Sequence, residues 1–229
     1  MQDTLIVIPA KNEAGTIATV IAEAREATYL PVLLVDDCSA DQTAAIAQAA
    51  GAMVLSPPLH LGAWGAMQTG LRYAQEHGYC RVITLDADGQ HEARWIPDLL
   101  AVLDRDEADL VIGAFPERGS HARHMAWSLF RRITGLSHED LTSGFRAYNA
   151  QAIELLAGEE ATLLDYQDIG VLLLARSAKL RIAEVPVQMR LRTTGPSRIF
   201  SSWWVVAKYM SETILLCLAH WGRSARQRS

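Results

Sequence analysis

The 229-residue sequence has few cysteines and lacks the common phosphate-binding motifs. Its three cysteines, Cys38, Cys80 and Cys217, are scattered along the chain, which argues against a disulfide framework and against a thiolate metal site. Neither GxxxxGKS nor GxxxxGKT occurs in the sequence. Gly62, Gly65 and Gly70 are spaced differently from the glycines of GxGxxG. A P-loop or a dinucleotide-binding turn therefore has no specific support. We expect a protein of the reducing cytoplasm.

Targeting signals and long apolar runs are also missing. The chain starts Met1-Gln2-Asp3 and enters an apolar run without the basic region of a signal peptide, so secretion is not expected. Between Phe200 and Trp221 apolar residues recur at near-helical spacing, but charged residues interrupt them. A membrane span needs about 18 to 20 apolar residues in a row. This segment is therefore predicted to be an amphipathic helix and not a transmembrane one.

Charge is unevenly distributed along the chain. The net formal charge is −5, with −13 on residues 1–175 and +8 on residues 176–229. The acidic body argues against nucleic acid as a partner, because it would repel a long polyanion. The basic C-terminal part, with its tryptophans, suits phosphate groups or an anionic membrane surface. Docking of that helix on the protein's own core or on a second subunit is the alternative.

Apolar runs alternate with helical patterns, and this alternation predicts a mostly parallel central sheet flanked by helices, an α/β fold. Length and apolar content fit one large domain without a linker or repeat. The predicted strands are 5–8, 32–35, 52–55, 81–85, 109–114, 144–148 and 182–187. The predicted helices are 16–27, 41–50, 63–77, one beginning near Pro97, and 120–134.

The run VITLDADGQH, residues 82–91, ends an apolar strand in two carboxylates one residue apart. Residues two apart on an extended chain point to the same side, so Asp86 and Asp88 can face one ligand. Such oxygen donors suit a divalent cation that keeps positions for water and phosphates. An EF-hand loop is excluded, because the positions that need Gly and Glu hold His91 and Pro97. A phosphatase-like aspartyl nucleophile stays open.

Polar clusters follow three of the predicted strands. They are Pro-Ala-Lys-Asn-Glu at 9–13, Asp-Asp-Cys-Ser at 36–39, and Asp-Ala-Asp at 86–88. In open α/β sheets, ligands bind beyond the carboxyl ends of the strands. We therefore expect these clusters to border one site.

Taken in order, the motifs resemble the family 2 glycosyltransferases of GT-A (Rossmann-like) fold, closest in style to the dolichol-phosphate and polyprenyl-phosphate mannose synthases. Each motif alone is weak, but the ordered set is specific. The resemblance covers roughly residues 4–198, and we expect a transferase domain at 1–198 followed by an amphipathic helix with a basic tail at 199–229. The matching segments are 7–13, 35–43, 61–66, 85–91, 140–146, 184–187 and 192–198.

The resemblance implies inverting, metal-dependent transfer of a hexose from a GDP- or UDP-sugar to a polyprenyl phosphate or another membrane-associated acceptor. Asp86, Asp88 and Gln90 would hold Mg²⁺ or Mn²⁺ against the diphosphate. For Asp37 a turn or helix-capping role is the alternative. The implied nucleotide-sugar-binding residues are Pro9, Ala10, Asn12, Glu13, Asp37, Gly62, Asp86, Ala87, Asp88, Arg192, Ser197 and Arg198.

The segment Asp140–Arg146 is the implied catalytic loop. Asp140 would be the base, with Asp88 and Arg146 as further catalytic residues. A lipid phosphate has its second ionisation at about pH 6, so a strong base would be optional with that acceptor. The residues implied for the acceptor phosphate are Arg118, Arg131 and Ser143.

Four residues depart from the family pattern, so the identity of the donor sugar nucleotide stays open. They are Lys11, Cys38, His60 and Trp64. Trp64 either narrows the pocket or packs in the core. We expect a cytoplasmic protein, peripheral on the inner face of the cell membrane. The alternatives are a phosphatase or nucleotidyltransferase that uses Asp86 and Asp88, and a non-catalytic nucleotide-sugar-binding module.

Overall fold

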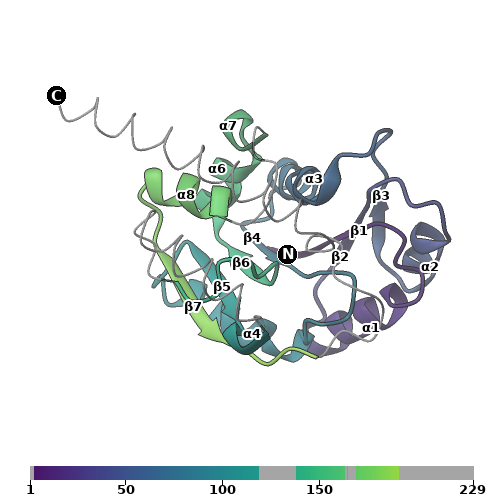
Figure 1. Cartoon of the computed structure of the whole chain (residues 1–229), viewed down its shortest axis with the longest axis horizontal. Coiled ribbons are helices and arrows are strands. Elements are labelled where there is room, and N and C mark those ends of the chain that lie inside the picture. The colour runs from purple at the N-terminus through teal and green to yellow at the C-terminus, as the bar shows by residue number, and fades with distance from the viewer. Residues whose placement is uncertain (1–2, 119–137, 163, 165–168, 191–229) are drawn as a thin grey trace. The chain divides into compact units, whose positions relative to one another are not determined.

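The computed structural model describes residues 3–118, 138–162, 164 and 169–190. In this part of the chain seven strands form one sheet in the order β3-β2-β1-β4-β6-β5-β7 (Figure 1). Neighbouring strands pair in parallel, except that β6 runs antiparallel to both β4 and β5. The predicted α/β fold with a mostly parallel sheet is thereby confirmed. The strands are β1 (Thr4–Ala10), β2 (Val32–Asp36), β3 (Met53–Leu55), β4 (Arg81–Thr84), β5 (Leu110–Ala114), β6 (Arg146–Tyr148) and β7 (Ile182–Pro186).

Helices cover both faces of the sheet. On one face α1, α2 and α4 pack against the strands, and on the other face α3 and α6 do so (Figure 1). None of the described helices is long and apolar enough to cross a membrane. The helices are α1 (Ile17–Thr28), α2 (Thr43–Ala49), α3 (Gly62–Glu76), α4 (Ile96–Asp104), α6 (Ala150–Ala157), α7 (Glu159–Thr162) and α8 (Ile169–Ser177), with short 3-10 turns η1 (Ala93–Trp95) and η2 (Pro116–Arg118).

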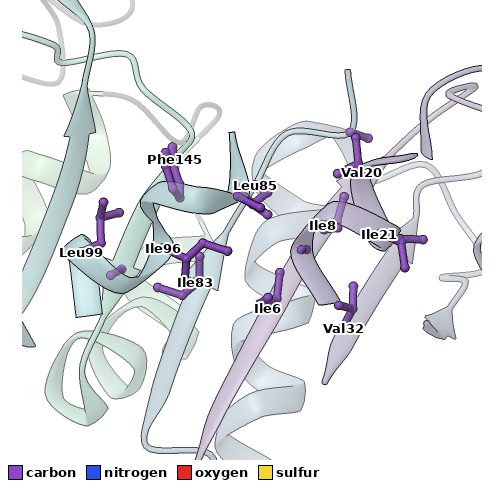
Figure 2. Packing of buried hydrophobic residues seen from close by; sticks show 14 of the residues in the cluster. Ile6, Ile8, Val20, Ile21, Val32, Ile83, Leu85, Ile96, Leu99 and Phe145 are labelled. Atoms are coloured by element: carbon purple, nitrogen blue, oxygen red, sulfur yellow. The ribbon is translucent and has the colours of Figure 1, made fainter. Parts of the chain in front are cut away.

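Side chains alternate along β1, so this strand contributes to the apolar packing on both faces of the sheet. Ile6 and Ile8 point toward α1 and α4 and join the buried cluster of Figure 2, while Val7 points the other way, as the period of two requires. On that face α3 lies directly over β1, because a Cβ added at Gly70 would overlap Val7 Cγ1. A glycine in the middle of α3 thus allows the close approach of helix and sheet.

One side of α3 donates hydrogen bonds to the end of α6 and to α7. Trp64 Nε1 donates to Ala161 O at 2.7 Å, and Gln68 Nε2 donates to Leu156 O and Gly158 O at 3.0 Å each. Residues four apart lie on the same helix face, and the last carbonyls of a helix need such donors. Trp64 is 2% exposed, so it packs in the core between α3 and α7.

Most predicted elements are found, with boundaries that differ by a few residues. Helices α6, α7 and α8 were not predicted. The start of α6 did carry a local signal, since the side chain of Asn149 accepts a hydrogen bond from Ala152 N and Asn is a preferred capping residue. The predicted helix at 120–134 and the predicted C-terminal helix lie outside the described residues.

Candidate active site

The three polar clusters meet at one edge of the sheet. Strands β2, β1 and β4 are neighbours and run in parallel. Their carboxyl ends, and the loops at 11–16, 37–42 and 85–91, therefore lie side by side. The clusters predicted from the sequence to border one site are adjacent in the structure.

The loops after β1 and β2 are joined by hydrogen bonds from side chain to backbone. Asn12, in a left-handed conformation with φ of 55°, donates its N–H to Ser39 Oγ at 2.9 Å and accepts from Ala40 N through Oδ1 at 2.7 Å. Glu13 N donates to Thr43 Oγ1 at 2.8 Å. These contacts fix the shape of both loops.

A second link joins the loop after β1 to the loop after β4. Thr16 Oγ1, at the start of α1, donates to Ala87 O at 2.7 Å. Ala87 is 4% exposed and Ala10, at the end of β1, is 5% exposed, while Pro9 is half-buried. These residues are small and at least half-buried, and their expected contact with a nucleotide stays a prediction.

Asp37 holds the beginning of α3. Its Oδ1 accepts from Leu61 N at 2.6 Å, and its Oδ2 accepts from Gly62 N at 3.0 Å and lies 2.6 Å from His60 Nδ1. Gly62 has a φ of +78°, which suits glycine at this turn. Asp37 therefore has the turn-holding role that was its alternative, and nucleotide binding by Asp37 stays a prediction.

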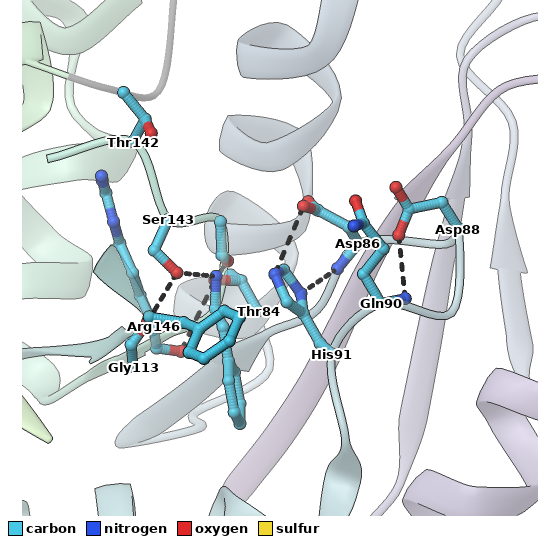
Figure 3. A network of polar contacts seen from close by, with 12 residues as sticks. Thr84, Asp86, Asp88, Gln90, His91, Gly113, Thr142, Ser143 and Arg146 are labelled. Carbon is cyan, nitrogen blue, oxygen red and sulfur yellow. Dashed lines mark hydrogen bonds and ion pairs between the residues drawn. The ribbon is translucent and has the colours of Figure 1, made fainter. Parts of the chain in front are cut away.

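The candidate metal loop carries three oxygen-bearing side chains. The side chain of Asp86 is 35% exposed, and Asp88 Oδ1 accepts from Gln90 N at 3.1 Å. The turn between them uses Gly89 with a φ of +77°. Figure 3 shows the heads of Asp86, Asp88 and Gln90 gathered along one edge of this loop.

This donor set fits Mg²⁺ or Mn²⁺ that is shared with a substrate. The described residues contain no group of three or more His, Cys, Asp or Glu side chains placed to hold a metal. Two carboxylates and an amide oxygen would leave several positions to water and diphosphate oxygens, which is how Mg²⁺ is usually bound.

The loop at 140–146 reaches Asp86 from another part of the sheet. Thr84 Oγ1 donates to Gly144 O at 2.7 Å, and an added Cβ on Gly144 would lie 2.5 Å from Asp86 Oδ1. The two segments expected to carry catalysis are thus in contact. Gly144 and His91 contact Asp86 but had no predicted role. The contact of Gly144 depends on the pairing of β6 with β4, and that of His91 depends on the fold of its own loop.

The carboxylate of Asp140 is fully buried. Its Oδ2 accepts from Phe115 N at 3.2 Å, and its Oδ1 accepts from Thr142 N at 3.2 Å. Its own N–H donates to Glu184 Oε1 on β7 at 2.9 Å. These contacts shape the loop, and the role of Asp140 as a base stays a prediction.

Ser143 and Arg146 are also turned into the protein. Ser143 Oγ donates to Gly113 O at 2.7 Å, and Arg146, only 1% exposed, donates from Nη2 to Leu141 O at 3.2 Å. Their roles toward acceptor and catalysis stay predictions. The remaining predicted site residues lie outside the described part of the chain: the side chain of Arg118, and Arg131, Arg192, Ser197 and Arg198.

Known proteins with similar sequences and folds agree with this architecture. The model of glycosyl transferase family 2 matches residues 5–156. An undecaprenyl-phosphate mannosyltransferase of Micrococcus luteus is 32% identical over 85% of this chain and 86% of its own length. A polyprenol monophosphomannose synthase of Mycolicibacterium smegmatis is 27% identical over 88% and 82%.

A solved structure of similar fold is glucosyl-3-phosphoglycerate synthase of Mycobacterium tuberculosis with Mn²⁺, UDP and phosphoglyceric acid. It has a TM-score of 0.70 and 23% identity, over 94% of this chain and 76% of that chain. The family match spans well over half of the sequence. The protein therefore belongs to glycosyl transferase family 2 and is a glycosyltransferase of GT-A fold.

Proposed function

We propose that the protein transfers a hexose from a GDP- or UDP-sugar to a polyprenyl phosphate, with inversion at the anomeric carbon. The observation that carries this proposal is the position of the oxygen donors of Asp86, Asp88 and Gln90 beside the loops that follow β1 and β2. The mannosyltransferase and mannose synthase relatives support the choice of acceptor. The solved neighbour with Mn²⁺ and UDP supports a divalent cation and a nucleotide diphosphate.

On the donor side the loops at 11–16, 37–42 and 85–91, together called the cradle, are shaped before the donor binds. Asp86, Asp88 and Gln90 would hold Mg²⁺ or Mn²⁺, which when bound stabilises charge on the leaving diphosphate. The hydrogen bonds that join the loops after β1, β2 and β4 keep the cradle in one shape before the donor arrives. The residues proposed to line the nucleotide sugar are Pro9, Ala10, Asn12, Glu13, Asp37, Gly62, Ala87, Arg192, Ser197 and Arg198.

On the acceptor side the phosphate provides its own nucleophile. Its second ionisation lies at about pH 6, so one oxygen is largely anionic at neutral pH. That oxygen bonds to the anomeric carbon while the bond to the diphosphate breaks, and nucleoside diphosphate leaves. Asp140 is the proposed base where the acceptor is a hydroxyl group. Arg118, Arg131 and Ser143 are proposed to serve the acceptor phosphate, and Arg146 is proposed as a further catalytic residue.

Residues 199–229 are proposed to lie at the membrane surface, separate from a transferase domain of residues 1–198. Residues 199–229 contain four Lys or Arg and one Glu, a net charge of +3, which supports attraction to anionic lipid headgroups. A lipid acceptor would be met at that surface. The proposed location is therefore peripheral, on the inner face of the cell membrane.

A transfer assay tests the proposal. Purified protein is incubated with a panel of radiolabelled GDP- and UDP-sugars and Mn²⁺, with and without polyprenyl phosphate, and the lipid extract is counted. We expect label in the extract only when polyprenyl phosphate is present, and none with Asp88→Asn. Asp98→Asn, an exposed carboxylate on α4, is the control and keeps full activity.

Other results point to other functions. Release of inorganic phosphate from simple esters without sugar transfer would favour a phosphatase. Donor binding without turnover on any acceptor would favour a nucleotide-sugar-binding module. Transfer to a soluble acceptor alone would keep the transferase activity and overturn the lipid acceptor.

A further inference from the structure

The carboxylate of Asp86 is flanked by two residues that come from different parts of the chain. His91, labelled in Figure 3, lies five residues further along the same loop. Gly144 belongs to the loop that precedes β6. Both contact Asp86 directly. Neither residue has an assigned role in the proposed metal site.

His91 contacts both the backbone and the side chain of Asp86. The backbone N–H of Asp86 donates to His91 Nδ1 at 3.0 Å, so Nδ1 carries a lone pair and the neutral ring has its proton on Nε2. His91 Nε2 lies 3.5 Å from Asp86 Oδ2. The protonated nitrogen therefore faces the carboxylate, while the other nitrogen holds the backbone of the same residue.

The imidazole has little freedom to leave this position. His91 is 4% exposed, and its ring stacks on Phe145 with centroids 5.4 Å apart. The backbone around it pairs with the chain after β7, through the bridge between His91 and Met189. Burial, stacking and strand pairing together fix the ring opposite Asp86.

Gly144 limits Asp86 from the other side. A Cβ on Gly144 would lie 2.5 Å from Asp86 Oδ1 and 3.0 Å from Asp86 Cγ. Gly144 does not have a positive φ, so its backbone suits alanine, and the added Cβ would force the Asp86 carboxylate to shift. The hydrogen bond from Thr84 Oγ1 to Gly144 O holds the glycine in place.

We propose that His91 and Gly144 are positioning residues that set the orientation of the Asp86 carboxylate for the divalent cation. The inference rests on the proposed function, which makes Asp86 a metal ligand. A ligand that is already oriented loses less entropy on binding, and outer partners of metal ligands typically contribute about 10- to 100-fold in metal affinity. The contact at Gly144 also ties the metal loop to the loop that contains Asp140.

The test compares Mn²⁺ affinity with metal-free stability in four variants. His91→Phe keeps the ring that stacks on Phe145 but removes both nitrogens, His91→Asn restores an acceptor for Asp86 N–H, and Gly144→Ala adds the intruding Cβ. The fourth variant, Gly15→Ala, is the matched control, because a Cβ there meets nothing within 4 Å. Dissociation constants come from titration calorimetry, and unfolding midpoints are measured in EDTA.

We expect His91→Phe and Gly144→Ala to bind Mn²⁺ about 10- to 100-fold more weakly. We expect His91→Asn to bind more tightly than His91→Phe, and Gly15→Ala to match the wild type. A purely structural role would lower the midpoint in EDTA and leave the affinity of the folded variants unchanged. Unchanged affinity in folded His91→Phe and Gly144→Ala would overturn the inference.

A second measurement does not depend on the metal. Nitrogen-15 NMR of the wild-type protein reports the tautomer of His91. We expect an unprotonated Nδ1 with scalar coupling through the hydrogen bond to the Asp86 amide nitrogen. A protonated Nδ1 would overturn the inference even if every variant misfolds. A wild type with this coupling but no affinity for Mn²⁺ would instead overturn the metal-dependent function and support the contact itself.

Discussion

Arg181 Nη2 lies 2.8 Å from Asp109 Oδ1, at the end of the sheet opposite the candidate active site. Asp109 precedes β5 and Arg181 precedes β7, so the pair joins two parallel neighbours where both strands begin. Arg181 N also donates to Asp109 Oδ2 at 2.7 Å, and Asn149 Nδ2 donates to Asp109 Oδ1 at 2.9 Å. The side chain of Asp109 is 4% exposed, so its charge is well shielded from water.

This carboxylate is expected to make stability depend on pH in the acid range. Hydrogen bonds from Arg181 hold the pKa of Asp109 at about 2, below its ordinary value of 3.8. The stabilisation is therefore complete above 3.8 and is lost as pH falls toward 2. At 1.36 kcal/mol per unit, it amounts to about 2 kcal/mol. We expect Asp109→Asn to lose this stability at neutral pH, as measured by urea unfolding.

The pH profile supplies the control for that experiment. Glu107→Gln removes an exposed carboxylate that pairs with the exposed Arg105, and exposed pairs contribute little. Its unfolding curve should follow the wild type at each pH. If wild type and Asp109→Asn lost stability in parallel between 3.8 and 2, another group would be responsible.

The contact between α3 and β1 predicts that a helix-favouring substitution will destabilise the protein. Alanine is favoured over glycine in a helix by about 1 kcal/mol, but a Cβ on Gly70 would overlap Val7 Cγ1. Overpacking of a core typically costs about 1 to 3 kcal/mol, so the clash should prevail. We expect Gly70→Ala to lower the free energy of unfolding in denaturant titration.

A double-mutant cycle identifies the cause of that loss. In a Val7→Ala background the obstructing methyl groups are absent, so Gly70→Ala should become neutral or stabilising. An equal loss in both backgrounds would show that the Cβ of residue 70 meets something other than Val7.

The buried amide of Gln68 predicts a second, independent loss. Gln68 Nε2 donates to Leu156 O and Gly158 O at the end of α6, and the residue is 3% exposed. Gln68→Leu leaves both carbonyls without this donor, which should cost about 1 to 3 kcal/mol. Gln75→Leu, on an exposed position of the same helix, is the matched control. Equal stability of the two variants would mean that water replaces the amide.

The sequence predicted the edge of the sheet where the site lies, because three apolar runs end in polar clusters and parallel strands bring such ends together. It did not predict the direction of β6. That strand has only three residues, Arg146–Tyr148, and it runs antiparallel between β4 and β5. Its pairing is decided by contacts between distant parts of the chain, which a local pattern does not contain.

The burial of side chains is a second property that a local sequence pattern does not predict. The resemblance assigned Asp140 and Arg146 to catalysis, but the sequence did not predict their burial, because charged side chains are rarely fully buried. In the structure they are 0% and 1% exposed and hold the backbone of their own loop. The hydrogen-bond partners of Asp37 were not predicted from local sequence either, because Leu61 and Gly62 belong to another loop.

The cradle at the carboxyl ends of β1, β2 and β4 predicts that donor and metal stabilise the protein together. A ligand at 100 times its dissociation constant adds about 2.7 kcal/mol to the free energy of unfolding. If the diphosphate is held through a cation at Asp86 and Asp88, a GDP- or UDP-sugar should raise the unfolding midpoint with Mn²⁺ and give little shift in EDTA. Asp88→Asn should lose the shift, and Asp98→Asn should keep it. An equal shift in EDTA would mean that the protein binds the nucleotide sugar without a metal, through the loops after β1 and β2 alone.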